Sequence, residues 1–340
     1  MRPRLAALAA TQSGLITRTQ AIEAGYTERE LRTCTSVQGP WAVVRRGVYV
    51  DRARWESLDE RDERWRLRDR AAQLSTSVEH VLSHDSAARS LELPFLRPRT
   101  PLVHVTRPGV GGSRTEHGVK HHLSRLPPPQ QATPDGLQVT GLARTALDLA
   151  REHGFETGVT ACDAALQRGA TFADLAAQLE TMTCWPHITR ARAAVEHADP
   201  GAESVGESLA RLLVLELDLG PVQTQFAVRT SRGTAWCDLR VGCHVFEFDG
   251  RVKYLRTHEG GVAARPVTEV LWEEKRRQND VCAAGLGMSR IIWDDLWGAQ
   301  RSHALDRLRA EYAVTRQRFG ARLPEHLARF DREQAERRTA

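Results

Sequence analysis

The chain has 340 residues, of which 41% are hydrophobic and 27% are charged. These values lie near globular averages, which excludes a largely disordered or fibrous chain, and the length favours two or three domains. The net charge of +5 favours a polyanionic partner such as DNA, but it is far too small for a histone-like protein.

The start of the chain, MRPRLAALAATQSG, contains an apolar run that is too short for a secretory signal or a membrane span. The six cysteines form no CxxC pair and no metal-finger spacing, which is typical of reduced thiols in a chain of this size. We therefore expect a cytoplasmic protein with no membrane partner.

Three short helices followed by a β-hairpin are predicted at the beginning of the chain. The helices are expected over residues 4–12, 17–25 and 27–36. Thr27 with Glu30 three residues later has the pattern of a capping box, and residues 41–50 alternate and turn at Arg46 and Gly47. This order predicts a winged helix-turn-helix domain over residues 1–50, in which the third helix enters the major groove of DNA and the hairpin touches phosphates.

The candidate DNA contacts of this domain are Arg29, Arg32, Arg45 and Arg46. Glu28 and Glu30 lie on the same third helix and weaken its attraction for DNA. Because many winged helices bind only proteins, a protein partner stays open as the alternative.

Residues 51–199 are predicted to form a mixed α/β domain. A long charged amphipathic helix over 54–75 precedes two strands near 101–109 and 118–126, and helices follow to residue 199. Three histidines, His117, His121 and His122, lie on or beside the second strand. Histidines in such places are usually solvated or hydrogen bonded, so we predict no metal there.

After the linker Asp199-Pro200-Gly201 the pattern changes to helix, three strands, helix and strand. These elements are expected over residues 203–219, 222–230, 234–242, 243–250, 266–285 and 288–298. The predicted fold class is therefore multidomain α/β, with an αβββαβ core over residues 200–300. A charged helical tail follows over residues 301–340; its apolar positions do not sustain a heptad, which favours a solvated helix over a pairing helix.

Acidic residues gather at the end of the third strand of this core. Glu247 and Asp249 are two residues apart on one strand and therefore point the same way, and Asp238 on the preceding strand can reach them across a hairpin. Converging carboxylates suit Mg²⁺ or Mn²⁺, and without a cation they would repel one another. The alternative is a plain turn with an edge-strand acid that faces solvent.

Lysine is rare in this chain, which makes its positions informative. Only three of the 48 basic residues are lysine: Lys120, Lys253 and Lys275. A lysine ammonium is compact and has a tunable pKa, so it can act beside a phosphate oxygen and an attacking water. Lys253 lies near enough in sequence to the acids to serve in this way.

The order of Glu207, Asp238 and the EFDG segment at residues 247–250 resembles the PD-(D/E)xK nuclease fold, particularly its branch of very-short-patch-repair endonucleases. The resemblance covers residues 201–297. It implies that Asp238 and Glu247 bind the metal, that Glu207 holds a second ion or a metal-bound water, and that Lys253 acts on the nucleophilic water. Asp249 would be a further ligand.

This chain departs from the family at one position, because Asp249 occupies the place of the usual lysine. The lysine role must then fall to Lys253 or Lys275, or be absent. The arginine-rich helix that follows resembles that of the family as well. On this helix, Lys275, Arg276 and Arg277 are further candidate DNA contacts.

The front of the chain resembles the AbiEi antitoxin family of abortive-infection systems in GLITRTQAIEAG, WAVVRRGVYV, LSHDSAA and RTALDLA, over residues 5–195. Two functions follow. The first is a metal-dependent DNA endonuclease in phage defence or repair, for which a homodimer stays open because a double-strand cut often implies two sites. The second is an antitoxin-like transcriptional repressor with an inactive nuclease-fold domain and a toxin-like neighbour as its partner.

Overall fold

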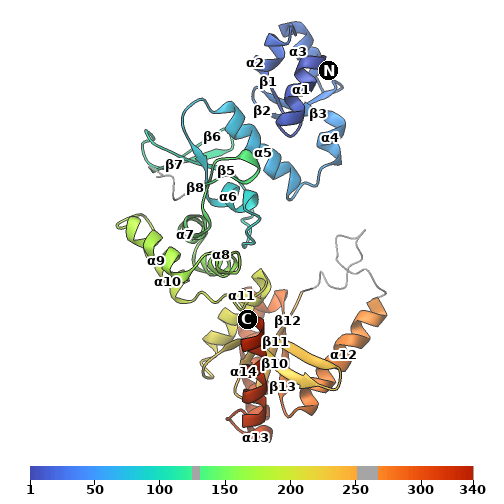
Figure 1. The fold of residues 1–340 in the computed structure, drawn as a ribbon, viewed down its shortest axis with the longest axis vertical. Helices are drawn as coiled ribbons and strands as arrows, with labels where there is room; N and C mark the ends of the chain where they lie inside the picture. Colours follow the sequence, from blue (N-terminus) through green and yellow to red (C-terminus); the bar gives the residue numbers. More distant parts are fainter. Residues whose placement is uncertain (125–130, 251–266, 340) are drawn as a thin grey trace. The chain divides into compact units, whose positions relative to one another are not determined.

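The structure, a computed structural model, describes residues 1–124, 131–250 and 267–339 (Figure 1). It is a mixed α/β structure that divides into two compact units, Met1–His197 and Ala198–Ala340. The sequence separates residues 1–50 from 51–199, whereas the structure holds both segments in the first unit. The break between the units lies beside the linker expected at residues 199–201.

The first unit begins with three helices and a three-stranded antiparallel sheet of strand order β1-β3-β2, followed by a fourth helix. The elements are α1 (Pro3–Thr11), β1 (Ile16–Thr17), α2 (Arg18–Glu23), α3 (Glu28–Cys34), β2 (Trp41–Arg45), β3 (Val48–Asp51) and α4 (Arg52–Ser57). The capping box of α3 is confirmed, because Thr27 and Glu30 each accept the backbone N–H of the other. The predicted turn at Arg46 and Gly47 joins β2 to β3.

The rest of the first unit is built on a six-stranded mixed sheet of order β6-β7-β5-β4-β9-β8. Its strands are β4 (Val81–Leu82), β5 (Val103–Arg107), β6 (Arg114–Glu116), β7 (Val119–Leu123), β8 (Gln131–Ala132) and β9 (Val139–Thr140). Its helices are α5 (Glu63–Ser75), α6 (His84–Ser90), η2 (Pro134–Gly136), α7 (Leu142–His153), α8 (Phe155–Gln167), α9 (Phe172–Thr181) and α10 (Ile188–Glu196). A buried ion pair ties α5 to α6: Arg89 Nε donates to Asp69 Oδ2 at 2.7 Å.

The second unit contains a four-stranded sheet of order β10-β11-β12-β13, in which only the pair β12 and β13 is parallel. Its elements are α11 (Val205–Glu216), β10 (Gln223–Thr230), β11 (Gly233–Val241), β12 (His244–Asp249), α12 (Val267–Ala283), β13 (Gly287–Ile292), η5 (Trp293–Leu296), α13 (Gly298–Phe319) and α14 (Glu325–Thr339). The elements from α11 to β13 follow the predicted αβββαβ order.

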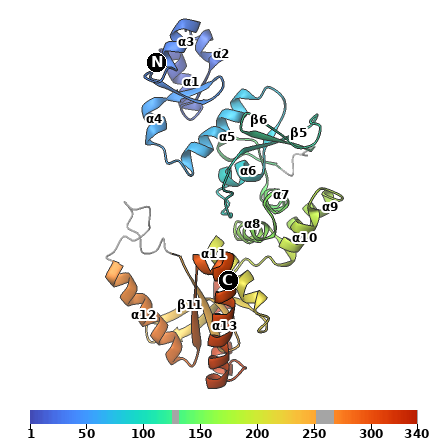
Figure 2. The ribbon, with the colours of Figure 1, turned by 180° about the vertical axis from the view of Figure 1, so that it is seen from behind.

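Alternate residues of β12 contact different helices, because successive side chains of a strand point to opposite faces. His244 Nδ1 lies 2.6 Å from Thr315 Oγ1 of α13, whereas Glu247 pairs with Arg277 of α12. Figures 1 and 2 show α12 and α13 on either side of the strands. The sheet therefore separates α12 from α11 and α13, and the acids of β12 face α12.

The last forty residues are not the solvated tail that their charge suggests. In α13 the side chains of Leu305, Leu308 and Tyr312 are buried, and in α14 those of Leu327 and Phe330 are buried. These apolar residues form a narrow stripe within arginine-rich helices, and a stripe of this kind is easily hidden by the overall charge. The prediction of a solvated tail is therefore wrong.

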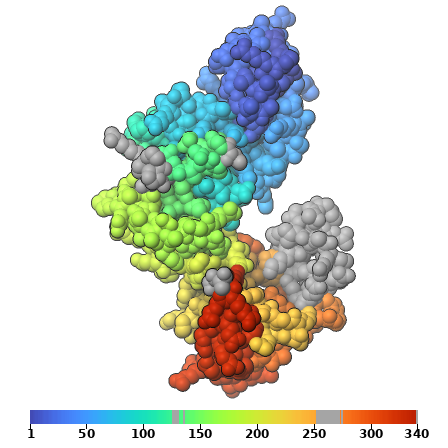
Figure 3. Space-filling view, viewed as in Figure 1, coloured from blue at the N-terminus to red at the C-terminus, as the bar shows by residue number. Residues whose placement is uncertain are grey.

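Helix α14 also completes the edge of the sheet. Asp331 Oδ1 accepts the backbone N–H of Ala227 on β10 at 2.9 Å, and Asp331 Oδ2 accepts from Gln223 Nε2 at 2.6 Å. Figure 3 shows α14, in red, on the surface of the second unit. None of the helices in the described ranges combines the length and the apolar composition needed to cross a bilayer.

Candidate carboxylate site of the second unit

Glu207 is fixed at the first turn of α11. Ser204, the N-cap, accepts the backbone N–H of Glu207 at 3.2 Å and donates its hydroxyl to Glu207 Oε1 at 2.9 Å. The other carboxylate oxygen, Oε2, accepts the backbone N–H of Glu203 at 2.8 Å. The local sequence ESVGE thus makes a reciprocal cap that holds the Glu207 carboxylate in one orientation.

Asp238 lies where the regular pairing of β11 with β12 stops. The backbone pairs run from Val241 with His244 to Leu239 with Phe246. One step further, the backbone N–H of Phe248 donates to the side chain of Asp238, at 2.8 Å to Oδ2.

The neighbouring strand is distorted at the same level. Gln225, which lies opposite Asp238 on β10, has a φ of 50°, a left-handed conformation that is rare outside glycine. Such strained positions cluster at functional sites. Asp238 therefore stands at an interruption of both strand pairs that flank it.

Glu207 and Asp238 lie close enough to interact electrostatically. Burial raises the pKa of the Glu207 carboxyl above its usual range, and the negative charge of Asp238 raises it further. The hydrogen bonds from Glu203 and Ser204 act in the opposite direction and do not offset this rise. Two neighbouring carboxylates of this kind are stabilised by a cation, and their hard oxygen atoms fit Mg²⁺ or Mn²⁺.

Glu247 and Asp249 each pair with an arginine. Arg277 Nη2 of α12 lies 3.2 Å from Glu247 Oε1, and Arg290 Nη1 of β13 donates to Asp249 Oδ2 at 2.9 Å. A pocket of about 20 Å³, enough for one water molecule or ion, is lined by Glu247, Phe248, Asp249, Arg277, Gln278, Met288 and Arg290. These guanidinium groups therefore relieve part of the repulsion among the acids, for which the sequence predicts a cation.

Cys237 connects the two parts of the site. Its thiol is buried, and burial together with the charges of Glu247 and Asp238 raises its pKa well above the usual range. Both carboxylates thus lie within interaction distance of one sulfur atom. The acids do not form a closed cage, however: in the described part of the chain, three candidate ligands within 4.8 Å of one another are found among His84, His104 and His122.

The predicted basic residues of α12 have different surroundings. Arg277, expected to contact DNA, donates to Glu247 and to the backbone carbonyl of Trp236. Lys275 and Arg276 are exposed, and the guanidinium of Arg276 lies 4.4 Å from the ring centroid of the exposed Trp272. Lys253 lies outside the described residues.

The candidate DNA contacts of the first unit lie on α3 and at the β2–β3 turn. Arg29, Arg32 and Arg46 are exposed, and Arg45 is half-buried. The two acids of α3 have basic partners, since Glu28 pairs with Arg18, and Glu30 pairs with Arg2 at 2.9 Å. These ion pairs weaken the objection that the acids of α3 repel DNA.

Sequence reasoning overlooked Arg290 and Gly206 at this site. Arg290 is the register partner of Glu247 in the parallel pair of β12 with β13, and a single charged residue inside the strand segment GMSRII was the signal for it. Gly206 is contacted by the ring of Phe248: a Cβ atom added there would lie 1.9 Å from Phe248 Cε1. This close approach brings the start of α11 against β12.

No protein-family model matches this chain, and no curated protein shows significant similarity to it.

Proposed function

We propose that this chain is a metal-dependent DNA endonuclease, in which the second unit hydrolyses phosphodiester bonds and a winged helix over residues 1–50 positions the chain on DNA. The observation that carries this proposal is the placement of two fixed carboxylates where α11 meets the interrupted strands: Glu207, held by the Ser204 cap, and Asp238, held by the amide of Phe248. The αβββαβ order around this point and the resemblance to PD-(D/E)xK nucleases support it. Phage defence or repair is the corresponding role.

In this mechanism the carboxylates of Asp238 and Glu207 would hold Mg²⁺ or Mn²⁺. Glu247, expected as a further ligand, faces α12 and would hold the Arg277 guanidinium beside the site. When bound, such an ion polarises a phosphoryl oxygen and lowers the pKa of a water molecule. The amide of Phe248 orients Asp238, and the Ser204 cap orients Glu207. Preorganisation of this kind keeps the acids in place before substrate arrives.

Arg277 and Arg290 supply positive charge beside the acids. Guanidinium groups bind phosphate oxygens in a bidentate manner, so both side chains can exchange a carboxylate partner for a DNA phosphate. The lysine that usually acts on the attacking water would be Lys253 or Lys275, or its role would be absent.

One observation favours a second function, an antitoxin-like repressor with an inactive nuclease-fold domain and a toxin-like partner. Asp249 occupies the position of the family lysine and is paired with Arg290. An acid in this position cannot stabilise developing negative charge as a lysine does. Such a chain would bind DNA through the winged helix without cutting it.

Incubation of the purified full chain with supercoiled plasmid and Mg²⁺ or Mn²⁺ separates the two functions. The endonuclease proposal expects nicked or linear plasmid, and chelation of the cation should stop its formation. DNA binding without strand breaks in either cation would replace this proposal with the repressor.

A second experiment tests the winged helix. Arg46→Ala is expected to weaken DNA binding and to lower the slope of log K against log salt by about one unit, because each lost phosphate contact releases about one fewer counterion. Arg45→Ala added to it should lower the slope by about one unit more. Fluorescence anisotropy over a series of salt concentrations measures both changes.

The control replaces two exposed arginines of α14, Arg329 and Arg332, by alanine, which removes the same total charge. This variant should keep the parent slope. If the slope changes there and not in the Arg45 and Arg46 variants, the DNA contact lies elsewhere and the winged-helix assignment is incorrect.

A further inference from the structure

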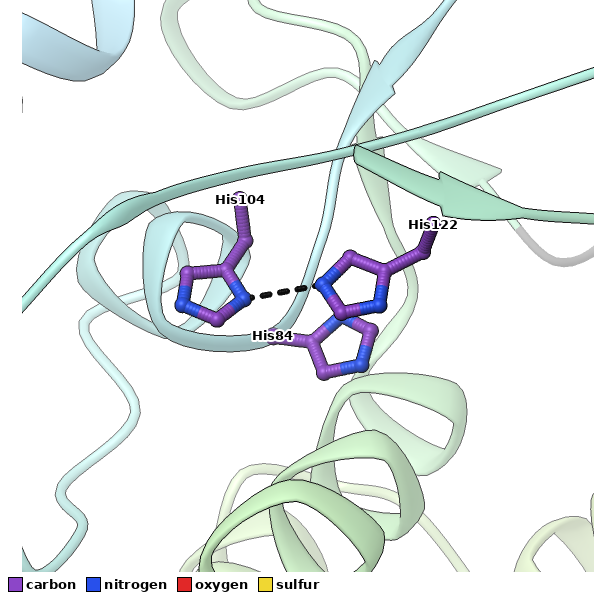
Figure 4. A group of neighbouring side chains, drawn as sticks. All are labelled: His84, His104 and His122. Carbon is purple, nitrogen blue, oxygen red and sulfur yellow. Dashed lines mark hydrogen bonds between the residues drawn. The ribbon is translucent and has the colours of Figure 1, made fainter. Parts of the chain in front are cut away.

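Three histidines from separate segments meet in the first unit, remote in sequence from the carboxylate site. His84 begins α6, His104 lies on β5 and His122 lies on β7 (Figure 4). One ring nitrogen of each lies within 4.8 Å of those of the other two. His104 Nδ1 and His122 Nε2 are 3.0 Å apart, and the ring centroids of His84 and His122 are 3.8 Å apart.

The fold brings these rings together through the register of two strands. β5 and β7 are parallel, with Thr106 opposite His122 and His104 opposite Lys120, so His104 and His122 share one face of the sheet. His84 approaches that face from the start of α6 with a φ of 49°, a left-handed conformation rare for a non-glycine residue. Strain of this kind is typical of functional positions.

Hydroxyl and carboxylate groups surround the three rings. His84 Nδ1 lies 3.0 Å from Ser83 Oγ, and His104 Nε2 lies 3.9 Å from Asp85 Oδ1. Asp85 Oδ1 is also 2.6 Å from His153 Nε2. Carboxylates beside the outward-facing nitrogens of histidines are a common second layer of metal sites, because they fix the tautomer and the ring orientation.

The rings are in the protonation state that metals bind. Burial lowers the pKa of His104 and of His122 to about 3, and it lowers the pKa of His84 well below the usual value. All three imidazoles are therefore neutral at pH 7, and each offers a lone pair.

The charged groups around the rings balance one another. Asp148 pairs with Arg144 at 2.7 Å and with Arg151 at 3.0 Å, and Lys120 pairs with Glu152. With Asp85 and the buried pair of Arg89 with Asp69 included, the surroundings contain four acids and four basic residues. The net charge of the surroundings therefore neither repels nor attracts a cation. Metal binding at this place depends on the histidine nitrogens themselves.

We propose that His84, His104 and His122 form a binding site for a zinc-type divalent transition-metal ion. Imidazole suits Zn²⁺, Co²⁺ and Ni²⁺, and three protein ligands leave a fourth position for water or a small ligand. His84 and His104 are buried and His122 is partly exposed, which gives the ion a route to the site. This site is independent of the proposed nuclease activity.

Metal binding would replace the contacts among the rings. Ligand nitrogens of a tetrahedral zinc site are roughly 3.3 Å apart, close to the present separation of His104 and His122. The three ring planes lie within 28° of one another, and an imidazole lone pair lies in the plane of its ring. The ring of His84 or His122 must therefore rotate when an ion binds.

The rival explanation is a stack of neutral imidazoles that only fills space. The metal-site proposal and this explanation predict different results in two titrations of the metal-free full chain. One uses Zn²⁺ in competition with a chromophoric chelator, and the other uses Co²⁺ followed by absorption. Our proposal expects one equivalent of Zn²⁺ and the intense visible bands of tetrahedral Co²⁺. Carboxylate-bound Co²⁺ in the second unit is octahedral and absorbs weakly, so it does not imitate this result.

His122→Gln should weaken Zn²⁺ binding by at least about 10-fold and abolish the Co²⁺ bands, because it removes a direct ligand. The matched control is His121→Gln, the adjacent histidine on β7, whose Nδ1 lies 3.3 Å from Arg107 Nε. Zn²⁺ should raise the melting temperature of the parent and of this control, but not of His122→Gln.

The parent measurement decides the question even if His122→Gln fails to fold. A parent chain without tetrahedral Co²⁺ bands, or a folded His122→Gln variant that binds Zn²⁺ as tightly as the parent, would overturn the proposal.

Discussion

Asp238→Asn and Glu247→Gln are each expected to lower Mg²⁺-dependent plasmid cleavage by at least about 10²-fold. Both changes keep the size of the side chain. The first removes a charge that would hold the cation, and the second removes the charge that holds the Arg277 guanidinium beside it. The amide oxygen that Asp238→Asn introduces can still accept the backbone N–H that Phe248 now donates to the carboxylate. The local structure should therefore persist, and initial nicking rates at a fixed Mg²⁺ concentration measure the loss.

A stability measurement distinguishes a cation site from a structural role for Asp238. The charge of Asp238 raises the pKa of Glu207, so the two carboxylates repel each other without a cation. Asp238→Asn removes that repulsion. In the metal-free chain it should keep or raise the melting temperature, whereas an acid needed for folding would lower it when neutralised.

The matched control is Asp306→Asn on α13, whose side chain is 83% exposed. It removes the same charge from the same unit and should leave the nicking rate unchanged. If Asp238→Asn and Glu247→Gln cut as fast as the parent, the carboxylate site is assigned to the wrong residues. If all three variants lose activity equally, general charge and not the site explains the loss.

Local sequence rules predicted much of the fold. The capping box of Thr27 with Glu30, the hairpin turn at Arg46 and Gly47, and the order of elements from α11 to β13 all depend on residues that are near one another in the chain. Such features follow from propensity, capping and periodicity. Glu247 and Asp249 could be named for the same reason, because residues two apart on a strand share a face, whereas Glu207 was named through the family resemblance alone.

The features of the structure that the sequence did not predict depend on contacts between distant segments. Arg290 becomes the neighbour of Glu247 only through the parallel register of β12 with β13, which follows an intervening helix. His84, His104 and His122 converge because β5 and β7 pair in parallel and α6 begins beside them. No periodicity within one segment encodes these registers, so the sequence predicts only solvated or hydrogen-bonded histidines near residue 120 and no metal.

Gly206→Ala is expected to destabilise the second unit by about 1–3 kcal/mol, the usual cost of overpacking a core. The added Cβ atom would lie 1.9 Å from Cε1 and 2.4 Å from Cζ of Phe248. The Phe248 ring cannot easily move aside, because it is 7% exposed and packs edge-on against Trp293. Alanine gains about 1 kcal/mol of helix propensity over glycine, which offsets only part of this cost.

The same substitution links the fold to the proposed chemistry. Relief of the clash requires α11 to move away from β12, and Glu207, the next residue, moves with it away from Asp238. We therefore expect Gly206→Ala to slow cleavage as well as to lower stability in urea unfolding. The control is Gly250→Ala, whose added Cβ would make an ordinary 3.7 Å contact with the same ring and should change stability by less than about 0.5 kcal/mol. A Gly206→Ala chain with the stability and cleavage rate of the parent would mean that the close approach of α11 to β12 does not position Glu207.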